Sequence, residues 1–413
     1  MSLGTLNSGF APASGGGASI PVWASIPAAA EGTRTNATLG GVAIVGRQGS
    51  DYIQPGYPTK AQLDSLWPAS PQEDGVAVGP MPCYWDTVAR QIPDRIYVIG
   101  DSNTVGQGAT PSNAGCRDVS WPVVLANSLG WRDGCACSQN LVAADSRVTP
   151  SGWTSAVKEI PGACWVHDVS ADDMVITLDV PFDRLLVTGV AIPGNPATTT
   201  ILVDDVSVGT LNHDLGSAST YHPVVDVPVT RGLHTIKVRS GGSSGTCYVN
   251  TVETFDSLST VPDFVHLGVA DANIGDHIST APYGAQARVK MFCGAGTTVC
   301  MNTINDLDDG IAVATIQAGF STLKGMWTSR PGSQWCGIVG WATNRPGVTK
   351  TDLDLLAGTL YDLSESTLGA WIDTRASLGY TYATTDPADV SDDWHLTTQG
   401  YAKQAAIVGK AFA

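Results

Sequence analysis

Two parts of the chain alternate short, fully apolar runs with longer amphipathic stretches. The run at residues 96–99 (IYVI) is typical of a strand buried on both faces, and residues 298–301 and 335–341 have the same character. Residues 120–129 (SWPVVLANSL) predict a helix, with Ser120 as its N-cap and a proline in its first turn. Strand, turn and helix in this order predict an α/β fold on a parallel sheet.

The spacing of large apolar residues predicts three more helices. The first two carry their apolar residues on one face, at Ile316, Phe320, Leu323 and Trp327 and at Leu353, Leu356, Leu360 and Leu363. The second of these helices is expected to have Thr351 as its N-cap and Asp354 as the returning acid. Residues 401–412 predict a closing helix, capped by Thr397 or Thr398.

Residues 165–255 break this α/β rhythm. Short runs rich in β-branched residues follow one another there, separated by Gly, Pro, Asn and Asp at the spacing of a β-sandwich. The runs cover residues 174–178, 185–190, 201–203, 206–211, 224–229, 234–239 and 247–252. Asp204, Asp205 and residues 241–245 are expected in turns. We therefore predict an antiparallel, jelly-roll-like β-sandwich inserted into the α/β domain.

Residues 1–91 have a different texture. Residues 12–19 (PASGGGAS) have the composition of a flexible linker, and prolines recur through the segment. It is expected to form an irregular arm or attachment module. The chain then divides into this arm, an α/β domain made of residues 92–164 and 256–413, and the inserted sandwich at residues 165–255.

Charge and cysteine content narrow the choice of partners. With 22 Lys and Arg against 38 Asp and Glu, the net charge of -16 argues against nucleic acid, which requires clustered cations. Residues 1–33 contain no Lys or Arg, so we expect no signal peptide, synthesis in a cytoplasm, and export by another route such as release within a particle. Nine cysteines is an odd number, and most are expected to be buried thiols.

The first chemistry-bearing motif is the turn after the first apolar run, Gly100-Asp101-Ser102. A serine at the carboxyl end of a sheet strand stands where open α/β folds build their sites. Backbone N–H groups in such a turn can hold a developing oxyanion. Taken alone, the segment is equally well explained as a strand-to-helix turn that uses Asp and Ser as caps.

The second motif, Asp392 to His395, stands just before the closing helix. Histidine supplies a base of near-neutral pKa for a hydroxyl, and a carboxylate fixes the imidazole tautomer. A spacing of three residues lets Asp392 reach its own histidine within one loop. A lone histidine before a helix more often has only a capping role.

Together, the two motifs resemble those of the SGNH, or GDSL, family of esterases and lipases. The resemblance implies a three-layer α/β/α, flavodoxin-like domain without metal or organic cofactor. It also implies Ser102 as nucleophile, His395 as general base and Asp392 as its orienting acid.

The family's two middle blocks supply further oxyanion donors. The resemblance places the block's asparagine at Asn305 and its glycine at Asp271, or at Ala270, while Ser102 contributes its own N–H. A competing placement of the asparagine block at residues 268–271 would put alanine where asparagine belongs. Asn305 is preferred because a helix and then a strand follow it. Asp271 is a poorer occupant than glycine, and a carboxylate pointing at the oxyanion would slow catalysis.

Other motifs carry no chemistry. Residues 241–245 (GGSSG) match a nucleophile-elbow pattern but lie between two predicted strands, so a hairpin turn is expected. The remaining histidines show no metal-ligand spacing, and no metal site is expected.

The arm and the inserted sandwich also resemble features of SGNH proteins carried in the tails of actinobacterial phages. This resemblance implies an esterase acting on envelope polysaccharide or lipid from a virion tail, with other tail proteins as partners and a homo-oligomeric state. One alternative is a catalytically silent SGNH scaffold that binds glycan. The other is a cytoplasmic thioesterase or lipase.

Overall fold

The computed structural model describes residues 95–141, 144–156, 164–214, 224–278, 297–301, 304–328, 334–365, 370–379, 381–409 and 412. Within the predicted arm it also describes four short strands, which are β1 (Ala37–Leu39), β2 (Val42–Ile44), β3 (Arg47–Gln48) and β4 (Asp51–Tyr52). The rest of residues 1–91, and with it the expected attachment role, lies outside the described residues.

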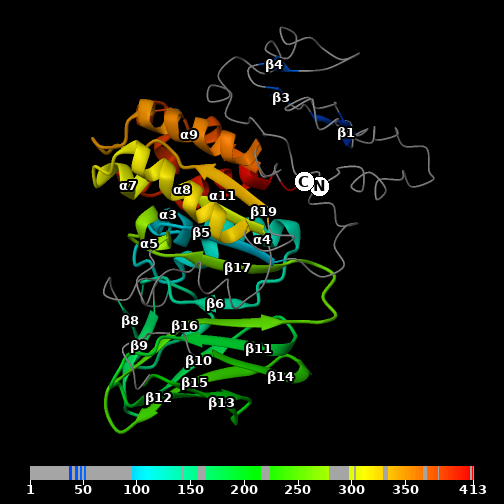
Figure 1. Ribbon diagram of the computed structural model, residues 1–413, viewed down its shortest axis with the longest axis vertical. Coiled ribbons are helices and arrows are strands. Elements are labelled where there is room, and N and C mark those ends of the chain that lie inside the picture. Colours follow the sequence, from blue (N-terminus) through cyan, green and yellow to red (C-terminus); the bar gives the residue numbers. More distant parts are fainter. Residues whose placement is uncertain are drawn as a thin grey trace, which may run out of the picture.

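A five-stranded parallel sheet organises the α/β part of the chain (Figure 1). Its strands are β5 (Arg95–Gly100), β17 (Asp263–Gly268), β18 (Thr297–Met301), β19 (Gln334–Val339) and β20 (Ala370–Asp373). They lie in the order β17-β5-β18-β19-β20, and every neighbouring pair is parallel. This is the flavodoxin-like order, in which the second strand of the chain lies outside the first. The predicted α/β fold is therefore confirmed.

Helices cover this sheet in two packed groups. α4 (Trp121–Leu129) packs against α11 (Thr398–Gly409), while α8 (Val313–Thr328) packs against α5 (Ile274–Ile278) and α9 (Lys350–Glu365). All six residues of β5 are buried, which requires cover on both faces of the sheet. The shorter helices are α3 (Ser102–Val105), α7 (Ile304–Asp308), α10 (Arg375–Leu378) and the 3₁₀ turns η3 (Cys116–Val119), η4 (Tyr382–Thr384) and η5 (Pro387–Asp389).

The predicted cap of α9 is wrong by two residues. Thr349 Oγ1 accepts a hydrogen bond of 3.1 Å from the Asp352 N–H and donates one of 2.6 Å to the Asp352 carboxylate. Thr351 and Asp354 lie inside the helix, and Asp354 pairs with Arg375 across 2.9 Å. Both threonines precede the leucine stripe at similar spacing, so the sequence pattern favours neither. At α11 the capping residue is Thr397, whose Oγ1 accepts from the Gly400 N–H at 3.2 Å.

The middle of the chain forms two antiparallel sheets. One has the order β13-β12-β15-β10-β7 and the other the order β14-β11-β16-β9-β8, with β6 also paired to β16. The strands are β6 (Cys135–Cys137), β7 (Val148–Thr149), β8 (Thr154–Ala156), β9 (Cys164–Asp168), β10 (Asp173–Thr177), β11 (Phe182–Gly189), β12 (Ala197–Val203), β13 (Val206–Asn212), β14 (Val224–Gly232), β15 (Thr235–Gly242) and β16 (Thr246–Phe255). Each of the predicted β-rich runs contributes to one of these strands.

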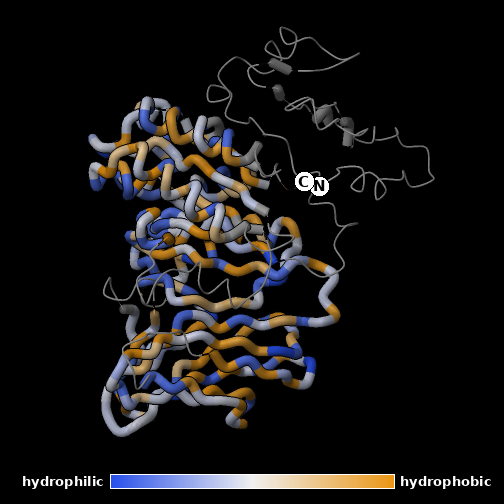
Figure 2. The backbone as a smooth tube through the Cα atoms, viewed as in Figure 1, coloured by the Kyte–Doolittle hydropathy of each residue, from blue (hydrophilic) through white to orange (hydrophobic). Residues whose placement is uncertain are grey.

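Buried side chains from both antiparallel sheets form one core. Ile201 and Ile236 come from one sheet, and Leu185 and Val249 come from the other. Hydrophobic segments accordingly follow the strands in Figure 2, while hydrophilic segments occupy many of the connections. The jelly-roll description and the division into domains stay predictions.

Two predicted turns in this region have different outcomes. Asp204 and Asp205 form the β12–β13 hairpin turn, with φ angles of +49° and +67°. Residues 243–245 also form a turn, but the flanking strands β15 and β16 belong to different sheets, so the predicted hairpin there is wrong. No helix follows this turn, so it lacks the strand-to-helix geometry of a nucleophile elbow.

Strands β6, β7 and β8 lie earlier in the chain than the predicted start of the sandwich at residue 165. They nevertheless pair with β16, β10 and β9 of the antiparallel sheets. Only two or three residues long, they carry little periodic signal. The pairing therefore joins residues 135–156 to the antiparallel sheets rather than to the parallel one.

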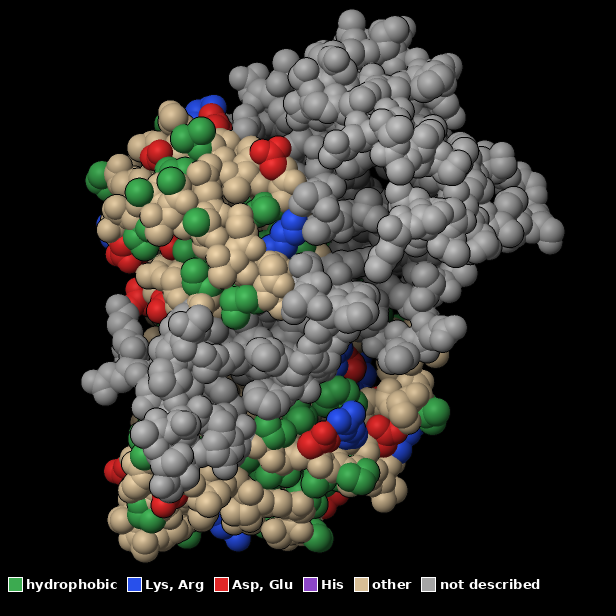
Figure 3. Space-filling view, in the orientation of Figure 1, with side chains coloured by type: hydrophobic (Ala, Val, Ile, Leu, Met, Phe, Trp, Pro, Cys, Tyr) green, Lys and Arg blue, Asp and Glu red, His purple; other side chains and the backbone are tan. Residues whose placement is uncertain are grey.

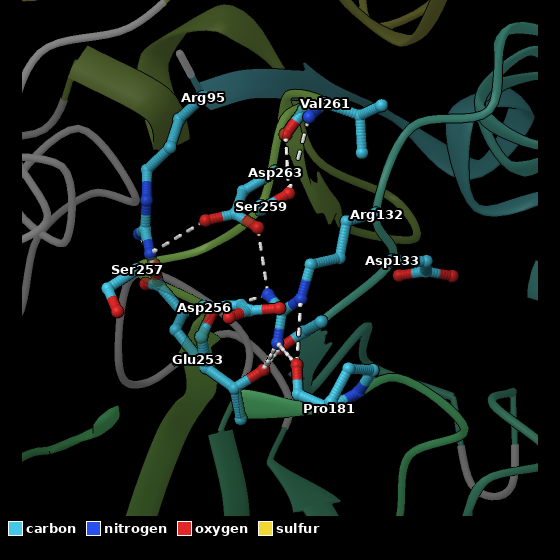
Figure 4. Close-up of polar contacts among 12 residues, drawn as sticks. Arg95, Arg132, Asp133, Pro181, Glu253, Asp256, Ser257, Ser259, Val261 and Asp263 are labelled. Atoms are coloured by element: carbon cyan, nitrogen blue, oxygen red, sulfur yellow. Dashed lines mark hydrogen bonds and ion pairs between the residues drawn. The ribbon is translucent and has the colours of Figure 1, made fainter. Parts of the chain in front are cut away.

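Two buried arginines join the parallel sheet to the antiparallel region (Figure 4). Arg95 starts β5 and forms ion pairs with Glu253 of β16 and, at 3.8 Å, with Asp263, which starts β17. Arg132 donates to the Asp263 carboxylate at 2.8 Å, to Thr254 O at 2.9 Å and to Pro181 O at 2.8 Å. The network lies at the amino ends of the parallel strands.

Cysteines in the described residues are free and buried, as expected for most of them; they are Cys116, Cys135, Cys137, Cys164, Cys247, Cys300 and Cys336.

On the face drawn in Figure 3, Lys and Arg side chains lie scattered among acidic, hydrophobic and uncharged ones. None of the helices in the described part of the chain is long and apolar enough to span a bilayer.

Candidate active site

Ser102 stands at the first residue of α3, directly beyond the carboxyl end of β5. Asp101 caps this helix, and its Oδ1 accepts from the Asn103 N–H at 2.9 Å. Asp101 is fully buried, and burial raises its pKa to about 7. Gly100 is required for close approach, because a Cβ there would lie 2.3 Å from Met301 O of the neighbouring strand. The turn therefore fixes the Ser102 hydroxyl at the carboxyl edge of the sheet.

His395 lies in a loop that closes on itself before α11. Ser391 N–H donates to His395 O at 2.9 Å, and Val390 forms a β-bridge with Leu396. Asp392 Oδ1 accepts from the N–H groups of Trp394 and His395, both at 2.7 Å. These contacts confine the carboxylate and the imidazole to one compact turn.

The structure brings Ser102, His395 and Asp392 into one chain of contacts. His395 Nε2 lies 3.0 Å from Ser102 Oγ, and His395 Nδ1 lies 2.9 Å from Asp392 Oδ2. Partial burial acts to raise the pKa of Asp392, but hydrogen bonds from His395 and Trp394 outweigh it and keep that pKa below its usual value. The carboxylate therefore stays ionised and holds the proton on Nδ1, which leaves Nε2 to accept the serine proton.

A glycine allows the histidine to come this close. Gly108 has a φ of +86°, and a Cβ there would lie 2.5 Å from His395 Cβ. Ser102 and His395 are both buried, whereas the Asp392 side chain is 49% exposed. The reacting atoms are thus enclosed on the histidine side, while the carboxylate contacts water.

The predicted oxyanion donors lie at the same edge of the sheet. β17, β5 and β18 are neighbours, and Asp271, Ser102 and Asn305 follow their carboxyl ends. Asn305 is buried in α7, and its Nδ2 donates to Ala272 O at 2.9 Å, which ties the asparagine block to the block that contains Asp271. Their role as oxyanion donors remains a prediction.

Asp271 occupies a backbone conformation that glycine adopts readily. Its φ is +66°, in the left-handed region, and its side chain is exposed. The resemblance assigns the family's glycine to this position, where the positive φ is one that glycine adopts without strain. Aspartate tolerates this region better than most side chains.

The conformation at Asp271 leads to a test. We expect Asp271→Gly to keep kcat/KM for a nitrophenyl acetate within about threefold of the wild type, since glycine adopts the same φ without strain. Asp271→Val should lower it by about tenfold or more, because a β-branched residue resists positive φ and displaces the backbone N–H. Initial rates of the three proteins decide this; equal rates for the glycine and valine variants would contradict it.

Two buried residues that the motifs did not identify support this edge of the sheet. His266 Nε2 donates to Thr104 O at 2.9 Å, and its Nδ1 accepts from Gln139 Nε2 at 2.6 Å. Gln139 O in turn accepts from the Ala270 N–H at 3.0 Å. Burial lowers the pKa of His266 to about 3, so the ring is neutral and can accept from Gln139. His266 thus joins the nucleophile helix to the segment carrying Asp271.

A metal centre has no ligand set here. In the residues that the structure describes, His, Cys, Asp and Glu do not gather in a group of three or more that could hold a metal ion.

Solved structures of other proteins share the fold of this chain. No protein-family model matches the chain, and no curated protein matches its sequence. Among solved structures, a peptidoglycan O-acetylesterase shares the fold with a TM-score of 0.52 and 13% identity, over 79% of this chain and 92% of that one. A lipolytic protein of the G-D-S-L family from Desulfitobacterium hafniense DCB-2 matches with a TM-score of 0.38 and 9% identity, over 77% and 99% of the two chains. The chain therefore shares the fold of that peptidoglycan O-acetylesterase.

Proposed function

We propose that this chain is a serine esterase that removes acyl groups, acetyl above all, from a cell-envelope glycan. The observation that carries the proposal is the contact between Ser102 Oγ and His395 Nε2 at 3.0 Å, with Asp392 on the far side of the imidazole. A hydroxyl, a base and an orienting carboxylate in this order are the requirements of nucleophilic acyl transfer.

The reaction runs in two displacements. Ser102 Oγ bonds to the ester carbonyl carbon while its proton passes to His395 Nε2. That proton then goes to the alcohol oxygen as the single bond between this oxygen and the carbonyl carbon breaks. Water attacks the resulting acyl-serine with His395 again taking a proton, and the acid leaves as Ser102 regains its hydrogen. Asn305 Nδ2 and the backbone N–H groups of Ser102 and Asp271 would stabilise the oxyanion in both steps.

The glycan part of the proposal rests on the shared fold. A solved structure that matches 79% of this chain is, by its name, a peptidoglycan O-acetylesterase. A place in a virion tail, with homo-oligomeric assembly and tail partners, rests on the texture of residues 1–91 and of the antiparallel region. Lipid esters are the alternative substrate at the same site.

Release of acetate from O-acetylated peptidoglycan tests the proposal, with Ser102→Ala as the control for uncatalysed hydrolysis. We expect the wild type to release acetate far faster than the variant and to prefer acetyl over long-chain nitrophenyl esters. Equal rates of wild type and variant on every ester would favour the silent scaffold. Preference for long acyl chains or for acyl thioesters would favour the lipase or thioesterase alternative.

A further inference from the structure

Asn103, the residue after the proposed nucleophile, reaches across to the loop of the proposed base. Its Nδ2 donates to Trp394 O at 3.0 Å, and Trp394 immediately precedes His395. The two residues lie 291 positions apart in the chain, and Asn103 is buried. The amide therefore links the element that carries Ser102 directly to the element that carries His395.

The amide of Asn103 has a fixed orientation. Its Oδ1 accepts from Trp341 Nε1 at 3.2 Å. The Tyr401 hydroxyl lies 3.3 Å from the same oxygen and donates its hydrogen to Gln107 O at 2.8 Å. The indole N–H is a donor only, so Oδ1 must face Trp341 and Nδ2 must face Trp394 O. Trp341 follows β19 and Tyr401 lies in α11, so Asn103 is held by elements on two sides.

Residues before α9 also contact the Trp394 segment. The Arg345 guanidinium lies over its ring, 3.6 Å from the centroid. Beside it, Asn344 Nδ2 donates to Asp393 Oδ1 at 3.1 Å. Of these contacts, the one from Asn103 comes from the helix that begins with Ser102, so it couples the position of Trp394 to that helix.

We propose that Asn103 is a positioning residue for the catalytic pair: by holding the Trp394 carbonyl, it sets the separation of Ser102 Oγ and His395 Nε2. The inference rests on the proposed function and adds to it a residue that touches neither substrate nor the transferred proton. The physical reason is that proton transfer requires hydrogen-bond reach, and a displacement of about 1 Å can cost about a hundredfold in rate.

Asn103→Asp removes the donor and keeps the shape. One oxygen of its carboxyl group still accepts from Trp341, but the other oxygen faces the acceptor Trp394 O and can donate to it only when the carboxyl is protonated. We expect kcat for a nitrophenyl acetate to fall by about 10- to 100-fold with KM unchanged. The ratio of wild-type to variant rate should rise with pH, because a protonated carboxyl can donate to Trp394 O and a carboxylate cannot.

Asn195→Asp is the matched control. Asn195 is also a buried amide, and its Nδ2 donates to the Thr246 carbonyl at 2.7 Å in the antiparallel region. The same chemical change there should leave kcat and its pH profile unchanged. Equal kinetics for the two variants would overturn the proposal, and so would a loss confined to KM.

A crystal structure of Asn103→Ala separates this proposal from the proposed function. The Ser102 Oγ to His395 Nε2 distance should exceed hydrogen-bond reach in the variant while the remaining fold is retained. An unchanged distance of 3.0 Å would overturn the role of Asn103 whether or not the protein is active. A wild type inactive on all esters, with a displaced histidine in the variant, would reject the esterase function but keep the positioning role.

Discussion

Replacing Ser102 by alanine is expected to lower kcat/KM for hydrolysis of an acetyl ester by about 10⁴- to 10⁶-fold. In the proposed mechanism Ser102 Oγ bonds to the substrate, and this oxygen lies 3.0 Å from His395 Nε2. Alanine removes that atom and leaves the imidazole with no proton to accept from the protein. Residual turnover should come from direct attack of water on the bound ester, with the predicted oxyanion donors stabilising the tetrahedral intermediate.

Three further variants make this loss specific. His395→Ala should reduce the rate by a similar factor, and the double variant with Ser102→Ala should be no slower than either single one, because the two groups act as a unit. Ser128→Ala is the matched serine control: its hydroxyl donates to Leu125 O at 2.8 Å within α4, and its loss should leave the rate within about twofold. A purified Ser102→Ala protein that keeps a hundredth of the wild-type rate would exclude Ser102 as nucleophile.

The sequence located Ser102, Asp392 and His395 because the contacts that shape each motif are local. Asp392 accepts from N–H groups two and three residues further along, and Asp101 caps the helix that begins with Ser102. Asn305 was chosen because a buried strand precedes it and a helix follows, and its oxyanion role stays a prediction. Contacts between residues this close in sequence depend on residue type and spacing, so a single sequence is enough to predict them.

Residues that act over long sequence separations were not predictable in this way. Asn103 and Trp394 are 291 residues apart, and Gln139 and His266 are 127 apart. Nothing in the sequence around Gln139 marks it as a partner of a buried imidazole. The short strands β6, β7 and β8 were missed for a similar reason, since partners in the distant antiparallel sheets define them.

A large loss of stability is expected from a change at Arg132, which lies where the parallel sheet meets the antiparallel region (Figure 4). Its side chain is 4% exposed and donates to Asp263, Thr254 and Pro181. Burial raises the pKa of Asp263, although Arg95 and Arg132 act to lower it. Asp263 is thus a buried carboxyl whose charge depends on its two arginines.

Arg132→Met is expected to destabilise the full chain by about 3–5 kcal/mol, because it removes the closer partner of the buried Asp263 carboxylate and leaves it the longer contact with Arg95 at 3.8 Å. Methionine fills much of the volume but donates nothing, so Thr254 O and Pro181 O also lose a donor. The midpoint of denaturant-induced unfolding measures the change. Arg184→Met is the control: its ion pair with Asp226 is about half exposed, and the midpoint shift should be several times smaller. Equal shifts would contradict the importance of burial at Arg132.

The same variant separates stability from catalysis. Arg95 and Asp263 begin β5 and β17, whereas Ser102 follows the far end of β5; six residues at about 3.3 Å each put about 20 Å between the network and the nucleophile. Under conditions in which Arg132→Met is folded, its kcat/KM should therefore stay within about twofold of the wild type, since additivity holds for sites so far apart. If the folded variant loses as much activity as is expected for Asn103→Asp, the structural change at Arg132 must reach the catalytic residues. Gln139 and the segment after β6 would then connect the two places, because this segment contacts both the antiparallel region and the residues beside Ser102.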